Sequence, residues 1–184
     1  MYIPCCLTQN MFDQNIIRPI DLHFDVEKII KVYDDVWHLE NPENHQISIT
    51  SVDGKDTGSG IGNIDSLNFE ESRYNVLNEV FKDTYMEYVH NTLLEKFEIV
   101  RGRFMTLIGK TCYTYHSDPT WRLHIPVVTN IGGIFVIDDK VFRLENTGQV
   151  YLVNTTIVHS AINMSMKDRL HIVYGLQNEY RYSS

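Results

Sequence analysis

Eight short segments between Ile99 and Leu176 restrict the possible folds more than any other feature of the sequence. Each segment holds about five to ten residues, is rich in Val, Ile, Thr and Tyr, and ends at turn residues such as Asp138-Asp139. Runs of this kind are typical of β-strands. Eight of them without an intervening helical pattern favour a double-sheet jelly roll, which is a cupin-like double-stranded β-helix. The predicted strands are 99–107, 110–116, 121–128, 133–137, 140–144, 150–154, 159–163 and 169–176.

The first half of the chain has a different character. Residues 25–38 carry apolar side chains at three- and four-residue spacing and begin at Asp25, a good N-cap residue, so they predict an amphipathic helix. Residues 46–52 alternate as a short strand does, and 53–62 hold four glycines, which indicates a mobile, solvated loop. Residues 68–97 are predicted to be mostly helical, because their aromatic and aliphatic side chains share one helical face.

These patterns indicate a single domain over residues 1–184, mainly β with flanking helices. Within it, residues 1–97 are expected to form a helical lead-in on the substrate side, and residues 1–24 are its extended or irregular start. Residues 98–176 are expected to form the jelly roll that bears the functional site.

One constellation in the second half has the spacing of a metal site. His116 and Asp118 form a His-x-Asp pair, and His159 follows 41 residues after the aspartate. Two imidazoles and one carboxylate on one face of an octahedral iron(II) ion leave three positions open. Two of these positions can bind a 2-oxo acid, and the third can bind dioxygen. The spacing therefore predicts an iron(II) site at His116, Asp118 and His159, with 2-oxoglutarate as cosubstrate and O2 as oxidant.

Such a cosubstrate carries two carboxylates, and these need cationic partners in a partly buried site. Arg169 lies ten residues beyond His159 and can hold the far carboxylate with its planar guanidinium. Arg122 and His124 share one side of the strand predicted over 121–128, since alternate strand residues point the same way. They are expected to hold the carboxylate beside the keto group.

The second half also resembles a known family. The residues that carry the resemblance are His116-Ser-Asp118, Trp121-Arg-Leu-His-Ile-Pro126, Gly148-Gln-Val-Tyr-Leu-Val-Asn154, His159-Ser160 and Asp168-Arg-Leu-His171. They are similar to the aspartyl/asparaginyl β-hydroxylase family of 2-oxoglutarate- and Fe(II)-dependent dioxygenases, and most of all to its bacterial cis-proline-hydroxylase-like members. The animal members have glycine in place of the aspartate, whereas this chain keeps Asp118.

The resemblance implies roles for individual residues. It implies that His116, Asp118 and His159 bind iron. It implies that Arg169 binds the C5 carboxylate of 2-oxoglutarate, that Arg122 and His124 hold the C1 end, and that Met105 and Leu107 line the cosubstrate pocket. The implied reaction is hydroxylation of an unactivated carbon, and the small-molecule members favour a free amino acid or a derivative as substrate.

Three other functions fit parts of the pattern. A peptidyl hydroxylase of the aspartyl/asparaginyl type would use the same site on a peptide. A metal-dependent cupin-type enzyme would lack 2-oxoglutarate and would not need Arg169, and a non-catalytic jelly-roll binding module would need neither the His-x-Asp pair nor His159. A free amino acid would also need a cation for its own carboxylate, for which Arg101 and Arg103 are candidates.

Composition limits the partners. The net charge of −8 argues against binding along a nucleic-acid backbone, which requires clustered Lys and Arg. No stretch approaches the roughly 20 apolar residues that span a membrane. The three cysteines are odd in number and two are adjacent, which favours reduced thiols and a cytoplasmic location. A small molecule or a peptide is the expected partner, and the oligomeric state stays open.

Overall fold

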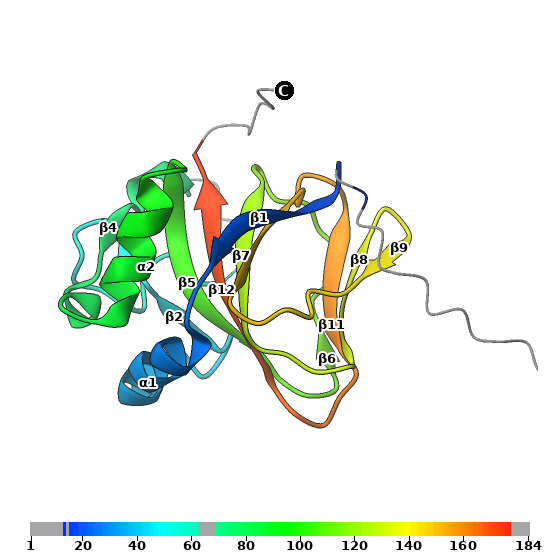
Figure 1. Cartoon of the computed structure of the whole chain (residues 1–184), viewed down its shortest axis with the longest axis horizontal. Helices are drawn as coiled ribbons and strands as arrows, with labels where there is room; N and C mark the ends of the chain where they lie inside the picture. The colour runs from blue at the N-terminus through cyan, green and yellow to red at the C-terminus, as the bar shows by residue number, and fades with distance from the viewer. Residues whose placement is uncertain (1–12, 14, 63–68, 178–184) are drawn as a thin grey trace, which may run out of the picture.

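In residues 13, 15–62 and 69–177, which the computed structural model describes, two antiparallel sheets face each other (Figure 1). The larger sheet has the order β1-β10-β7-β12-β5-β2, the smaller has β6-β11-β8-β9, and β3 and β4 form a short ribbon. The fold is a double-stranded β-helix, as the sequence predicts. Its strands are β1 (Ile17–His23), β2 (Gln46–Ser48), β3 (Thr50–Ser51), β4 (Val76–Leu77), β5 (Ile99–Leu107), β6 (Thr111–Cys112), β7 (Arg122–Val128), β8 (Gly133–Ile137), β9 (Lys140–Phe142), β10 (Gln149–Val153), β11 (His159–Asn163) and β12 (Arg169–Leu176).

The eight strands predicted after residue 98 are all present as β5 to β12. The predicted bounds of β5, β8, β11 and β12 are confirmed. The prediction for 110–116 is wrong in extent, since β6 covers only Thr111–Cys112, and a single bridge joins His116 to His159 further on. The chain between β6 and β7 is an open loop, and it carries two of the three predicted metal ligands.

Alternate residues of the larger sheet face opposite layers. Its outer face, with Leu123, Ile125 and Ile172 among others, belongs to the apolar cluster that includes the helices. Its inner face meets the smaller sheet, where a second apolar cluster holds Leu107 and Phe135. The inner face of the central strands is where polar side chains collect, among them Arg103, Arg122, His124, Arg169 and His171, which are all buried.

Helices α1 (Val26–Val36) and α2 (Tyr85–Leu94) lie beside each other against the outer face (Figure 1). Asp25 caps α1 as expected, because its carboxylate accepts hydrogen bonds from the backbone N–H groups of Glu27 and Lys28 at 3.1 and 3.3 Å. Three short 3-10 turns add to the helices: η1 (Trp37–Leu39), η2 (Glu71–Arg73) and η3 (Glu79–Phe81). No helix in the described part of the chain combines the length and apolar character that crossing a bilayer requires.

The prediction of a mostly helical 68–97 is wrong. Within 69–97 the structure has α2, the turns η2 and η3, and the short strand β4. Phe81 is one of the apolar residues that suggested a long helix. It is buried, but it belongs to η3 and lies outside α2.

The lead-in is not purely helical either. β1 and β2 form the two edges of the larger sheet, with Ile17 opposite Val153 and Gln46 opposite Met105. Residues 1–12 and 14 lie outside the described residues. The first half of the chain therefore completes the sheet that carries the site.

Candidate metal centre

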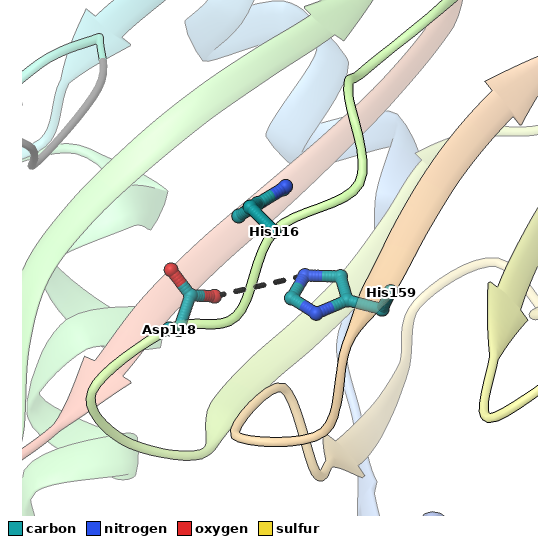
Figure 2. A group of neighbouring side chains, drawn as sticks. All are labelled: His116, Asp118 and His159. Carbon is teal, nitrogen blue, oxygen red and sulfur yellow. Dashed lines mark ion pairs between the residues drawn. The ribbon is translucent and has the colours of Figure 1, made fainter.

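His116, Asp118 and His159 come together at one end of the space between the sheets (Figure 2). One ligand atom from each side chain lies within 4.8 Å of the others. His159 is the first residue of β11, and the other two lie on the loop between β6 and β7. The bridge from His116 to His159 pins that loop to β11, because each backbone N–H donates to the other residue's carbonyl at 3.1 and 2.8 Å.

Both imidazoles are oriented in the same way. Nδ1 of His116 lies 2.8 Å from the carbonyl oxygen of Thr114, and Nδ1 of His159 lies 2.9 Å from that of Ile157. A carbonyl only accepts hydrogen bonds, so each Nδ1 carries a proton, and Nε2 is the nitrogen left to bind a metal. Burial lowers the pKa of His159, which also favours its neutral form. Both rings are therefore prepared to bind a metal through Nε2.

Asp118 is held as a carboxylate by its neighbours. Burial alone would raise its pKa, but the charge and hydrogen bond of Arg122 outweigh burial, and the pKa of Asp118 lies below its usual value. Arg122 approaches side-on, with Nε at 3.2 Å from Oδ2 and Nη2 at 3.0 Å from Oδ1. Oδ2 also lies 3.8 Å from Nε2 of His159, the contact drawn in Figure 2.

Behind Arg122 lies a buried carboxylate that the sequence analysis misses. Glu71 in η2 accepts from Nη1 and Nη2 of Arg122 and from Nη1 of Arg101, each at 2.8 Å. Arg101 also donates to the carbonyls of Gly60 and Gly62. The end of the glycine-rich loop is thus bonded to the site, whereas the sequence predicts a mobile, solvated loop. No sequence spacing links Glu71 to Arg122, which is 51 positions away.

We expect Glu71→Gln to lower the free energy of unfolding by about 3 kcal/mol, because removing one charge from a buried ion pair leaves its partners uncompensated. It should also weaken metal binding, since Arg122 would hold Asp118 less firmly. Urea unfolding of the metal-free protein and metal titration measure the two effects. Glu70→Gln is the control, because Glu70 is exposed and adjacent. An unchanged unfolding midpoint in Glu71→Gln would show that the network adds no stability.

The structure gives Arg122 more partners than the sequence predicts. Every nitrogen of its guanidinium is engaged, by Asp118, by Glu71 or by the hydroxyl of Thr120. Gly175 leaves room for this group, because a Cβ there would lie 2.6 Å from Nη1 of Arg122. These contacts make Arg122 a positioning residue for Asp118. Its predicted contact with the C1 end of 2-oxoglutarate stays a prediction, and would require one of these partners to be exchanged.

A cavity of about 350 Å³ opens beside the triad. Its lining includes the predicted residues His116, Asp118, His159, Arg122, His124, Arg169 and Met105. Leu107, predicted to line the pocket, is not among the described residues around this cavity. It packs in the apolar cluster between the sheets, directly opposite Arg169, the first residue of β12.

Arg169 faces the cavity with unused donors. It is 3% exposed, and its Nε and Nη1 have no hydrogen-bond partner among the described residues. Its guanidinium lies 5.1 Å from the centre of the Phe135 ring. Burial lowers the pKa of Arg169 to about 10, so the group stays charged at neutral pH. A buried cation without a counter-ion is costly, which indicates a site for an anion.

Other polar groups around Arg169 also lack partners. In the part of the chain that the structure describes, these are the hydroxyl of Tyr113, Nδ1 of His124 and both ring nitrogens of His171. Burial, followed by the charge of Arg169, lowers the pKa of His124 and of His171 well below the usual value, so both rings are neutral. Burial raises the pKa of Tyr113, which keeps its proton. Tyr113 and His124, which line the cavity, can therefore each donate one hydrogen bond to an oxygen of a bound molecule.

Comparison with known proteins shows which solved structures share this fold. No protein-family model and no curated protein matches the sequence. Among solved structures, the chain is similar to an oxidoreductase of the 2OG-Fe(II) oxygenase family from Burkholderia pseudomallei, at 16% identity and a TM-score of 0.50, over 88% of this chain and 84% of that one. It is also similar to HygX from Streptomyces hygroscopicus, solved with nickel and 2-oxoglutarate bound, at 10% identity and a TM-score of 0.51, over 90% and 85%.

A third structure, AviO1 from Streptomyces viridochromogenes Tue57, has 9% identity and a TM-score of 0.51, over 90% of this chain and 92% of that one. Identities this low show a common fold and nothing finer. The specific aspartyl/asparaginyl β-hydroxylase family therefore stays a prediction from the motifs. The chain has the fold of 2-oxoglutarate- and Fe(II)-dependent oxygenase structures, and it places a His-Asp-His cluster and an arginine without a described counter-ion in one cavity.

Proposed function

We propose that the protein is a 2-oxoglutarate- and Fe(II)-dependent dioxygenase that hydroxylates an unactivated carbon of a small molecule, most simply a free amino acid or a derivative. One observation carries the proposal. Three side chains that could bind a metal line the same cavity as Arg169, a buried cation without a counter-ion among the described residues. A metal enzyme without a diacid cosubstrate, or a binding module, would need that cation only for an anionic ligand of its own.

The donor set fits an iron(II) ion. Two neutral imidazole nitrogens and one carboxylate are the ligands of the facial triad, which leaves positions for other molecules. Arg122 fixes the orientation of Asp118, and two backbone carbonyls fix the imidazoles of His116 and His159. When bound, iron supplies the activation of dioxygen that the side chains themselves cannot provide.

The cavity also fits 2-oxoglutarate. Arg169 can hold the carboxylate far from the metal through two parallel N–H donors, and the hydroxyl of Tyr113 is a neutral donor close to the same charge. His124 lies on β7, two residues from Arg122, and its neutral ring can donate to the carboxylate nearer the metal. These residues would hold the cosubstrate in place and keep bulk water from its charged ends.

The balanced reaction defines the first test. One molecule each of 2-oxoglutarate, dioxygen and substrate would give succinate, carbon dioxide and a hydroxylated product. Succinate formation should require both added Fe(II) and 2-oxoglutarate, and a screen of the twenty amino acids should reveal at least one that stimulates it. Stimulation by peptides alone would select the peptidyl-hydroxylase alternative. Absence of metal binding, measured by anaerobic titration, would overturn the proposal.

A further inference from the structure

A second buried arginine faces the same cavity without a counter-ion. Arg103 on β5 is 5% exposed, and it forms no ion pair within the described part of the chain. Its Nη1 donates to the side-chain oxygen of Gln46 at 3.2 Å, and its Nε has no hydrogen-bond partner among those residues. The side-chain oxygen of Asn44, which also lines the cavity, is likewise buried and without a described partner.

Arg103 differs from its neighbour in this respect. In the sequence, Arg101 and Arg103 are equal candidates for binding a substrate carboxylate. The structure separates them, because Arg101 is saturated by Glu71 and by the carbonyls of Gly60 and Gly62. A bulge contributes to this difference: residues 101 and 102 together stand opposite a single residue, Tyr174, where the β5–β12 register shifts. Of these two arginines, only Arg103 keeps an edge of its guanidinium without a described partner.

The charges around the cavity can be balanced one by one. Of the arginines that line it, Arg101 and Arg122 are compensated by Glu71 and Asp118. Arg103 and Arg169 are left over. A bound Fe(II) ion would add two positive charges, and 2-oxoglutarate would remove two. Two positive charges then remain in a buried space, and one further carboxylate would lower that excess.

Arg103 lies to one side of the expected cosubstrate position. On β12, Val173 stands between Arg103 of β5 and His124 of β7. Strands are about 4.8 Å apart, so the backbones of these two residues are separated by about 10 Å. Arg103 and Leu107, the partner of Arg169, are four residues apart on β5, which is about 13 Å. These backbone separations favour a carboxylate at Arg103 that belongs to a different molecule from the one that Arg169 and His124 would hold.

We propose that Arg103, oriented by Gln46, binds a carboxylate of the oxidised substrate. This inference rests on the proposed function, and it narrows the substrate class to small molecules with a free carboxylate. With Gln46 at Nη1, the edge formed by Nε and Nη2 is left for two parallel hydrogen bonds to the carboxylate oxygens. Gln46 is a positioning residue, because it also accepts from the backbone N–H of Gly62 and so fixes the guanidinium against the loop.

The test uses the full chain loaded with Fe(II) and 2-oxoglutarate without oxygen. Two readouts are followed, the thermal midpoint and the visible charge-transfer absorption of the iron–2-oxoglutarate complex. The probes are the free amino acids and their carboxamides. We expect at least one amino acid to shift both readouts, and its carboxamide to bind roughly 30-fold more weakly or worse.

Variants assign the effect to Arg103. Arg103→Met should weaken binding of that amino acid roughly 30-fold or more and leave 2-oxoglutarate binding within a few-fold of wild type, while Arg103→Lys should restore part of the loss. The metal-free Arg103→Met protein should unfold at or above the wild-type temperature, because it loses an uncompensated buried charge. A purely structural arginine would give a lower midpoint. Arg143→Met is the matched control, since Arg143 lies near the surface beside Glu145.

Each contrary result would contradict a different statement. If amino acids and carboxamides bind alike, or none binds, the inference fails while the iron and 2-oxoglutarate data still stand. If Arg103→Met weakens 2-oxoglutarate instead of the amino acid, Arg103 belongs to the cosubstrate. If the wild-type protein binds neither iron nor 2-oxoglutarate, the proposed function itself fails.

Discussion

Replacing either histidine of the predicted metal site should remove tight iron binding. In His159→Ala or His116→Ala, two ligand side chains remain of three, and an outer-shell partner alone is already worth about 10–100-fold in metal affinity. We therefore expect a loss larger than 100-fold for each single variant, and no succinate formation at stoichiometric Fe(II). Anaerobic titration with Fe(II), followed by metal analysis of the desalted protein, measures the loss directly.

The two histidines should differ in their effect on folding. His159 is 4% exposed and begins a central strand, whereas His116 is exposed on a loop. His116→Ala should thus keep the wild-type unfolding midpoint in the metal-free state and isolate the loss of a ligand. His38→Ala provides a control, because His38 is an exposed histidine on η1, away from the cavity. Wild-type iron content in both His116→Ala and His159→Ala would rule out the triad.

The strand pattern predicts the sheet well, and the reason is physical. β5 and β12 lie between the helices and the smaller sheet, so their sequences are long, largely apolar or β-branched runs with clear ends. β1 is harder to recognise, because it lies at a sheet edge, contains Pro19, and is largely solvated on one side. Residues 68–97 mislead, since short 3-10 turns bury side chains at spacings close to those of a helix.

The sequence predicts those parts of the site whose residues lie close together in the chain. The His116-x-Asp118 spacing is visible in the sequence although both residues lie on the loop between β6 and β7, and Arg122-x-His124 follows the alternation of β7. Glu71 has no such signal, because only the folded chain brings η2 beside Arg101 and Arg122. A bulge that the sequence does not reveal also contributes to the difference between Arg101, which has ionic and carbonyl partners, and Arg103, which has no described counter-ion.

The ionic network explains how an acidic chain maintains a cationic cavity. Glu71 neutralises the arginines that only support the site, and Asp118 is both a partner of Arg122 and a predicted metal ligand. The remaining cations, Arg103 and Arg169, lie where a diacid and a substrate carboxylate would enter. A net charge of −8 for the whole chain therefore says little about the electrostatics of this pocket.

Arg169→Ala should raise the concentration of 2-oxoglutarate needed for half-maximal turnover by roughly 30-fold or more, because truncating one partner of a buried, hydrogen-bonded charge pair costs about 2–5 kcal/mol. The maximal rate at saturating 2-oxoglutarate should fall less, since the proposed contact of Arg169 is with the end of the cosubstrate away from the reacting carbons. Iron binding in the absence of 2-oxoglutarate should be unchanged, because Arg169 contacts none of the three ligands in the described structure.

Two further variants separate charge from shape at this position. Arg169→Lys keeps the charge but loses the planar pair of donors, and should fall between the wild type and Arg169→Ala. Arg143→Ala removes a more exposed arginine and should leave the 2-oxoglutarate dependence as it is. The metal-free Arg169→Ala protein should also be at least as stable as the wild type, because Nε and Nη1 of Arg169 have no described partner to lose. A lower unfolding midpoint together with an unchanged requirement for 2-oxoglutarate would show that Arg169 is a structural residue. Arg169 would then not be the group that binds the far carboxylate of 2-oxoglutarate.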